Sequence, residues 1–227
     1  MPQASINLAD LRGILQYVPR FRDRVFIVAI DGQIAASDNL NNILLDIAVL
    51  RSLNIRIILV HGIGYQLQAE AKRRGVVLSS HDGIGVTDAT TLDLAVNVAT
   101  SLTHEIMEGL TTVDLRAAYT NCLIAHPTGI IGGIDQQFTG KIEKVDAKCL
   151  EVMLDEGIVP IVPPIGFDGE GRTYRVNSDA IAVEIGEAVR AAKILFMLAQ
   201  DGLVINGSMI RQLPAAEAEE LVRKKRL

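Results

Sequence analysis

The stretch over residues 55–70, IRIILVHGIGYQLQAE, constrains the fold of this chain more than any other segment. It begins with a continuous apolar run, breaks at a glycine turn over residues 61–64, and resumes with Tyr65, Leu67 and Ala71 on one helical face. That order predicts a buried strand, a turn and the first turn of a helix. Free N–H groups and the positive end of the helix dipole make such a turn a candidate anion site. A purely structural strand–turn–helix unit is the alternative.

A second buried strand is predicted upstream, over residues 25–30, and it ends at Asp31-Gly32. Ser37 or Asp38 can cap the helix that follows this strand. Residues 25–75 therefore have the order β-α-β-α, which predicts an α/β fold with a parallel sheet and right-handed crossovers. Both glycine turns then lie at the carboxyl edge of the sheet, where open α/β sheets bind ligands.

The rest of the chain continues to alternate between helical and extended patterns. A glycine loop over residues 81–88, with Thr87 as the expected cap, leads into a long helix with an apolar face. Further strands are predicted over residues 121–125, 138–145, 158–162 and 194–198, and hairpins over residues 166–171 and 203–213. Further helices are predicted over residues 146–156, after the segment Asn177-Ser178-Asp179, and over residues 215–225.

Upstream of the first strand, apolar residues recur at helical spacing over residues 6–18 and predict a short amphipathic helix that Pro19 ends. We therefore expect an N-terminal helical arm over residues 1–22 and one domain over residues 23–227. The arm has no sheet partner, so it packs either on a neighbouring chain or on its own domain.

Composition and residue spacing exclude several classes of function. The net charge of −5 argues against nucleic-acid binding, and 49% hydrophobic residues supply a large core. No segment has the pattern of a signal peptide or of a membrane span, so a cytoplasmic protein is expected. Cys122 and Cys149 lack CxxC or metal spacing and are expected to be reduced thiols. The four histidines show no metal-binding spacing either, so His61 is interpreted as a turn residue and no metal site is expected.

Together these segments resemble the amino acid kinase family, specifically its N-acetylglutamate branch. The resemblance covers most of the chain and is carried, in order, by residues 31–32 (DG), 60–64 (VHGIG), 83–88 (GIGVTD), 140–142 (GKI) and 176–179 (VNSD). It implies a three-layer α/β/α sandwich around a mainly parallel sheet, shortened at the C-terminal end. Members of this family transfer the γ-phosphoryl group of ATP to a carboxylate, carbamate or phosphate.

Four positions depart from the kinase pattern of the family. Ala29 occupies the place of a lysine on the first strand, and Gly85 that of an arginine that holds the substrate carboxylate. Ile63 adds bulk to the glycine turn, and Arg175 replaces the first asparagine of an Asn-x-Asn-x-Asp motif. Phosphoryl transfer depends on cations placed against the phosphate oxygens, so we expect no catalytic residues here. An arginine introduced at Gly85 is expected to strengthen the binding of N-acetylglutamate if the geometry of the pocket is kept.

These departures resemble the degenerate kinase-like domain of bacterial N-acetylglutamate synthases. The resemblance implies a regulatory domain of arginine biosynthesis that has lost phosphoryl transfer and forms a homo-oligomer through its N-terminal helix. Capping of a helix is the alternative role for two of the expected ligand-binding residues, Asn177 and Asp179. The full expected set is Gly32, Gly62, Ile63, Gly64, Gly85, Arg175, Asn177 and Asp179.

The resemblance also limits the cofactors and partners. L-arginine and N-acetylglutamate are the possible ligands, and no cofactor is expected for the chain itself. Acetyl-CoA would bind only to an acetyltransferase domain, which is not among these residues and would be a separate or downstream partner. The alternative is an active N-acetylglutamate kinase that uses ATP and Mg²⁺, with Arg175 as an unrecognised cation.

Overall fold

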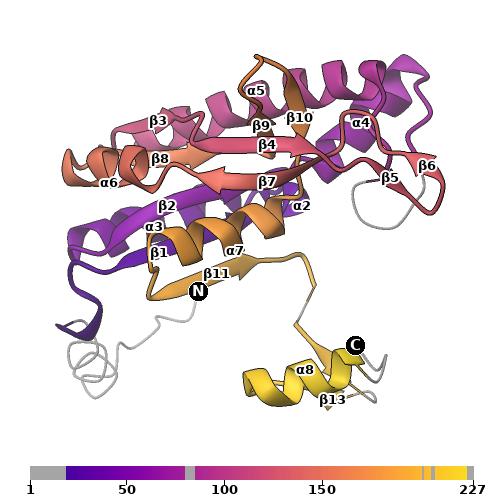
Figure 1. Ribbon diagram of the computed structural model, residues 1–227. Coiled ribbons are helices and arrows are strands. Elements are labelled where there is room, and N and C mark those ends of the chain that lie inside the picture. The colour runs from indigo at the N-terminus through magenta and orange to yellow at the C-terminus, as the bar shows by residue number, and fades with distance from the viewer. Residues whose placement is uncertain (1–18, 80–84, 201, 206–207, 224–227) are drawn as a thin grey trace. The chain divides into compact units, whose positions relative to one another are not determined.

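The computed structural model describes residues 19–79, 85–200, 202–205 and 208–223. The chain divides into two compact units, residues 1–197 and residues 198–227. At the centre of the first unit is a five-stranded sheet in which every neighbouring pair of strands is parallel (Figure 1). Its strands, in spatial order, are β11 (Lys193–Met197), β1 (Val25–Ile30), β2 (Arg56–His61), β8 (Val159–Val162) and β3 (Ala117–Tyr119). The predicted parallel sheet is confirmed.

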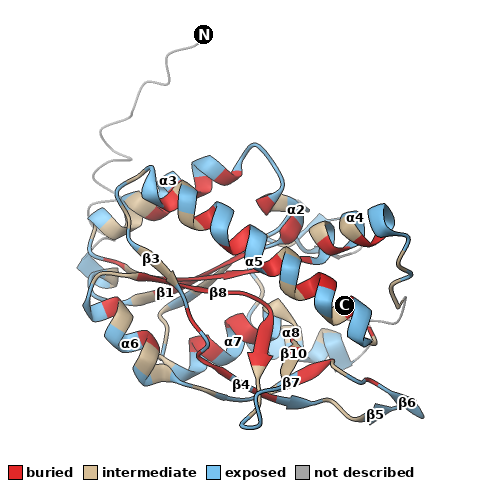
Figure 2. Cartoon of the chain, turned by 90° about the horizontal axis from the view of Figure 1, so that it is seen from above, coloured by how far each residue is buried: buried red, intermediate tan, exposed pale blue. Residues whose placement is uncertain are grey.

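Helices cover both faces of this sheet (Figure 2). One face packs on α2 (Gly32–Ala35), α3 (Leu40–Ser52), α4 (Gly64–Arg74) and α5 (Ala89–Thr111), and the other on α6 (Ala147–Asp155) and α7 (Ser178–Ala188). Alternate residues of β1 enter the two cores: Val28 lies on the α3–α5 side and Ile27 on the α6–α7 side. Burial on both faces explains why these strands are continuous apolar runs rather than alternating patterns. The three-layer α/β/α architecture is thus confirmed.

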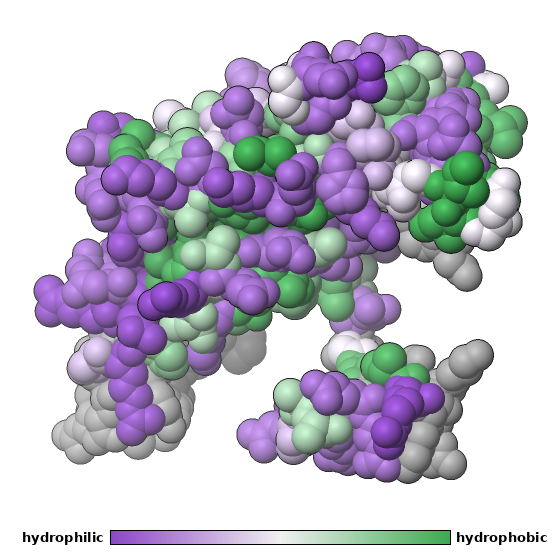
Figure 3. Space-filling view, viewed as in Figure 1, coloured by the Kyte–Doolittle hydropathy of each residue, from purple (hydrophilic) through white to green (hydrophobic). Residues whose placement is uncertain are grey.

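A smaller mixed sheet extends the layer that contains α6 and α7. Its strands, in spatial order, are β10 (Thr173–Arg175), β9 (Ile165–Phe167), β4 (Leu123–Pro127) and β7 (Gly140–Val145). Between β4 and β7 the chain forms a hairpin of β5 (Ile130–Ile131) and β6 (Ile134–Asp135). The three isoleucines of this hairpin are exposed and form an apolar patch on the face shown in Figure 3.

The predicted caps of two helices are wrong, each for a local reason. Asn39, rather than Ser37 or Asp38, precedes α3, because Ser37 instead closes the unpredicted helix α2 through its hydroxyl bond to the carbonyl of Ile34 (2.7 Å). Asp88, rather than Thr87, caps α5, and its carboxylate accepts from the N–H of Thr91 at 2.7 Å. That bond lowers the pKa of Asp88.

Two residues of the organising stretch also differ from the sequence interpretation. Tyr65 is exposed, because α4 directs Leu67 and Ala71 toward the core and Tyr65 lies well around the helix from them. His61 is the last residue of β2 and is fully buried, so it is not a turn residue.

The second unit contains β12 (Val204–Ile205), β13 (Ser208–Met209) and α8 (Ala215–Arg223). The two strands pair antiparallel, so the predicted hairpin and final helix are confirmed. Residues 6–18 of the predicted arm helix and the first part of the 81–88 loop lie outside the described residues. Residues 19–21 are described and helical, so the prediction that Pro19 ends the helix is wrong; proline is tolerated in the first turn of a helix. Within the described ranges, none of the helices combines the length and apolarity that a membrane crossing requires.

Candidate functional site

Three backbone segments meet at the carboxyl edge of the parallel sheet, where Figure 1 shows α2 and α4 beginning. A Cβ added to Gly32 would lie 3.3 Å from the carbonyl oxygen of Gly62 and 3.3 Å from the nitrogen of Gly64. A Cβ added to Gly62 would lie 3.3 Å from the hydroxyl of Ser178, at the start of α7. The glycines therefore permit backbone contacts that side chains would obstruct. The structure brings the two predicted glycine turns and the start of α7 together.

The starts of α4 and α7 differ in how their N–H groups are satisfied. Ile63 precedes α4, makes no side-chain cap, and has its side chain buried in the core, so it anchors the turn. Asn177 caps α7 by accepting from the N–H of Ala180 at 2.9 Å, which confirms the capping interpretation of Asn177. Helix α4 thus offers N–H groups without a side-chain cap, together with the positive end of its dipole.

Two carboxylates lie at the same edge. Asp31 follows β1 and caps α2: its carboxylate accepts from the N–H of Gln33 at 2.8 Å, and its own N–H donates to the carbonyl of Met197 at 3.0 Å. Asp179 lies in the first turn of α7, and its pKa is raised by partial burial and then by the negative charge of Asp31. Ala29, at the position of the family lysine, is buried on the same side of the sheet as α7. The edge therefore has an uncharged residue at the position of the kinase lysine, and two carboxylates near enough for the charge of one to raise the pKa of the other.

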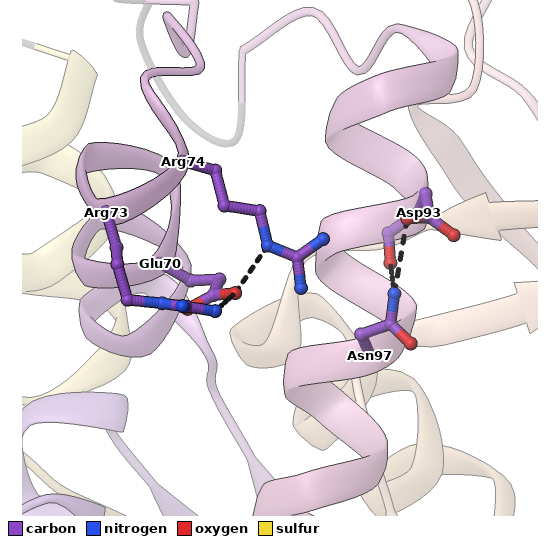
Figure 4. Close-up of polar contacts among 5 residues, drawn as sticks. All are labelled: Glu70, Arg73, Arg74, Asp93 and Asn97. Carbon is purple, nitrogen blue, oxygen red and sulfur yellow. Dashed lines mark hydrogen bonds and ion pairs between the residues drawn. The ribbon is translucent and has the colours of Figure 1, made fainter.

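The arginines on α4 lie too far away to replace that lysine. Arg73 and Arg74 both pair with Glu70 at 2.6 Å, and these bonds lower the pKa of Glu70 to about 2 (Figure 4). Figure 4 shows this cluster beside the Asp93–Asn97 bond of α5. Gly64 starts α4 and Arg73 lies near its end, so they are separated by roughly 14 Å along the helix axis.

Thr139 contacts both Gly85 and Arg175. The hydroxyl of Thr139 donates to the carbonyl of Gly85 at 2.8 Å and accepts from the N–H of Thr87 at 3.0 Å. Thr139 also forms a parallel bridge with Arg175, whose N–H donates to the carbonyl of Phe138 at 2.9 Å. Arg175 is half-buried, and burial lowers its pKa. Two residues beyond Arg175 the chain reaches the cap of α7.

His61 is a polar residue of this edge that sequence reasoning did not select. Its Nε2 lies 2.9 Å from the hydroxyl of Thr103 on α5. Burial lowers the pKa of His61 to about 4, an effect that the backbone of Gly62 partly offsets. No group of the described residues forms a hydrogen bond of good geometry with its Nδ1. The period-two pattern of Ile57, Leu59 and His61 would have placed it on the buried face toward α5.

Cations and metals have few candidate ligands at this site. Across the described part of the chain, no group of three or more His, Cys, Asp or Glu side chains is arranged to hold a metal ion. Cys122 is buried, and burial raises its pKa to about 12, which makes it an unreactive thiol at neutral pH.

The family model described as the amino acid kinase family matches residues 24–226. The chain belongs to the amino acid kinase family. It is 31% identical to an amino-acid acetyltransferase of Pseudomonas fluorescens over 214 residues, which cover 89% of this chain and 49% of that protein. A Pseudomonas putida protein of the same name is 31% identical over 94% of this chain and 52% of its own length. The chain spans about half the length of the curated relatives it matches.

Solved structures give the same result. N-acetylglutamate synthase from Neisseria gonorrhoeae, complexed with coenzyme A and N-acetylglutamate, has a TM-score of 0.89 at 28% identity, covering 95% of this chain and 51% of that one. The structure of the same protein with coenzyme A and L-arginine has a TM-score of 0.85 at 26% identity, covering 95% of this chain and 53% of that one. An isopentenyl phosphate kinase shares the fold alone, with a TM-score of 0.56 at 17% identity over 79% and 73% of the chains. The resemblance inferred from the sequence motifs is confirmed.

Proposed function

We propose that this chain is the kinase-like domain of an N-acetylglutamate-synthase-type protein of arginine biosynthesis. It serves regulation and assembly and transfers no phosphoryl group. Similarity to acetyltransferases and synthases over about half of their length supports the context. The proposal that the domain transfers no phosphoryl group depends on the chemistry at the carboxyl edge of the parallel sheet.

The observation that carries the proposal is the pair of carboxylates at that edge. In a phosphoryl-transfer site, cations neutralise the negative charge that spreads over the transferred phosphate. Here the pKa of Asp179 is raised by burial and by Asp31, whereas a neighbouring lysine would lower it. Ala29 supplies no charge, and the carboxylates of Asp31 and Asp179 would repel a polyphosphate. The edge is therefore unsuited to hold ATP with its γ-phosphoryl group in line for transfer.

The purified protein is expected to lack acetylglutamate kinase activity. With ATP, Mg²⁺ and N-acetylglutamate in a coupled assay, turnover should stay below about 1 s⁻¹, the lower end of ordinary enzymes. An active N-acetylglutamate kinase in the same assay is the positive control. Turnover above that level would show that another cation has taken the place of the lysine and would reject the proposal.

Arg175 is the specific feature that favours the alternative, an active kinase. It lies at the end of β10, next to the cap of α7, and burial lowers its pKa. If the assay does detect turnover, the variant Arg175→Gln should abolish most of it. The variant Arg172→Gln, on an exposed arginine of the same hairpin, should keep it.

The ligands that fit the proposal are L-arginine and N-acetylglutamate, each of which is named in a complex of the Neisseria protein. Both carry a carboxylate, and the uncapped start of α4 offers N–H groups and a positive dipole end for it. The expected ligand edge is formed by Gly32, Gly62 and Gly64, with Asn177 and Asp179 beside it. Ile63 anchors the turn from the core, and Gly85 and Arg175 meet nearby at Thr139.

The protein is expected to be an oligomer that depends on its N-terminal arm. Deleting residues 1–20 removes the apolar positions Leu8, Leu11, Leu15 and Val18 and should lower the mass measured by light scattering. Deleting residues 1–5 leaves these positions intact and should not change the mass. A monomeric parent, or an oligomer unchanged by the longer deletion, contradicts this expectation.

A further inference from the structure

The last residue of β2 is tied to the long helix α5 by one buried hydrogen bond. His61 is fully buried, Thr103 is 5% exposed, and Nε2 of His61 lies 2.9 Å from Oγ1 of Thr103. His61 directly precedes Gly62, whose N–H donates to the carbonyl of Ile30 at 2.8 Å. The glycine turn is thus fixed on one side by the sheet, and the residue before it is fixed by α5.

The other end of the turn is held by α4 and the core. Leu67 donates its N–H to the carbonyl of Ile63 at 2.8 Å, and the side chain of Ile63 is buried. Between Gly62 and Leu67 the start of α4 has no side-chain cap. The geometry of the N–H groups at the start of α4 therefore depends on the anchors at the two ends of the turn. Three polar bonds contribute: His61 to Thr103, the N–H of Gly62 to the carbonyl of Ile30, and Nε2 of Gln66 to the carbonyl of Gly32 at 2.8 Å. Only the first of these ties the turn to α5.

We propose that His61 and Thr103 are positioning residues that hold the Gly62–Gly64 turn, through their mutual hydrogen bond, in the geometry that accepts a ligand carboxylate. The inference rests on the proposed ligand edge but concerns groups that do not touch the ligand. Thr103 lies in the middle of α5, a helix of 23 residues packed on the sheet, so it is a rigid reference for the turn.

Valine and threonine have nearly the same shape, so Thr103→Val removes the hydroxyl and leaves Nε2 of His61 without its partner. The matched control is Thr100→Val on the same helix, because the hydroxyl of Thr100 bonds to the carbonyl of Val96 within α5. Thr103→Ser keeps the hydroxyl and is the rescue variant. All three variants are made in the full chain.

Amide hydrogen exchange gives the decisive measurement. In Thr103→Val the amides of Gly62 and Leu67, which flank the turn, should exchange about tenfold faster, the scale expected for losing one buried hydrogen bond. In the same variant the exchange rate of the Ile181 amide, at the start of α7, should change by less than about twofold. In Thr100→Val and in Thr103→Ser, the exchange rates of all three amides should change by less than about twofold. A merely structural role predicts equal acceleration at Gly62, Leu67 and Ile181. Equal acceleration, or no acceleration at the turn, overturns the inference.

Calorimetry with N-acetylglutamate and with L-arginine separates this inference from the proposed function. If the parent binds either compound, Thr103→Val should weaken binding about tenfold while Thr103→Ser and Thr100→Val retain it. Equal affinity in the parent and Thr103→Val contradicts the positioning role. Absence of binding in the parent counts against the proposed ligands, and the exchange rates at Gly62 and Leu67 still decide the positioning role.

Discussion

Replacing Gly85 by arginine is expected to destabilise the protein by about 2–4 kcal/mol, and not to create a clamp for a ligand carboxylate. Gly85 has φ +65°, a conformation that side chains with a Cβ rarely adopt. A Cβ there would also lie 3.0 Å from the hydroxyl of Ser79 and 3.2 Å from its carbonyl oxygen. Strain and crowding therefore act together at a buried position that the bond from Thr139 holds in place.

Smaller substitutions separate these two contributions. Gly85→Ala introduces both the left-handed strain and the contact with Ser79, whereas Gly129→Ala, at φ +80° with no atom within 4 Å of the added Cβ, introduces strain alone. Denaturant unfolding should show Gly129→Ala losing about 1 kcal/mol and Gly85→Ala losing more. A Gly85→Arg variant that is as stable as the parent and binds N-acetylglutamate more tightly would reject this expectation.

The layers of the fold could be predicted from the sequence because both faces of the central sheet are covered. Strands such as β1 and β2 are continuous apolar runs, and the glycine turns after them mark the carboxyl edge. The short strand β3 was missed, because Ala117–Tyr119 has no apolar run and joins the sheet only by pairing with β8. Such pairing depends on residues distant in the sequence, which local patterns do not reveal.

The candidate site was predictable in part. Gly32, Gly62 and Gly64 follow apolar strands that a parallel sheet aligns, so their proximity follows from topology. The partner of Gly85 could not be predicted, because Thr139 lies just before β7 and is 54 residues away in the chain. The missing lysine at Ala29 could be recognised only by comparison with the kinases of the family. The structure adds that Asp31 lies near enough to Asp179 to raise its pKa.

Acidification is expected to destabilise the protein through His61 well before the carboxylates contribute. Burial lowers the pKa of His61 from 6.5 to about 4, so the unfolded chain binds a proton that the folded protein does not accept. The stabilisation is complete above the unfolded-state value and is lost as the pH falls from about 6.5 toward 4. At about pH 5 the loss should reach about 2 kcal/mol relative to neutral pH.

Three carboxylates with lowered pKa values act in a lower pH range. The pKa values of Glu70, Asp88 and Asp168 are lowered by hydrogen bonds, so they stabilise the folded protein above their unfolded-state values of 4.5 and 3.8. Their contribution is lost only as the pH falls below those values. The raised pKa of Asp179 acts in the opposite direction, because protonation of this carboxyl group on acidification favours the folded protein. The contribution of the buried histidine is therefore isolated by comparing the parent with a variant that lacks it.

The measurement is denaturant unfolding at a series of pH values for the parent and two variants. His61→Gln removes the titrating ring and keeps a side chain able to bond to Thr103, so its stability should change by less than about 0.5 kcal/mol between neutral pH and about pH 5. His104→Gln, on a histidine whose side chain is 73% exposed on α5, should retain the pH dependence of the parent. The expectation is contradicted if the parent is equally stable at both pH values, or if the stability of His61→Gln depends on pH as that of the parent does. Either result would show that protonation of His61 does not destabilise the folded protein. In that case its free Nδ1 must find a hydrogen-bond acceptor when charged, and the backbone of Gly62, the neighbouring polar group, would be the first candidate.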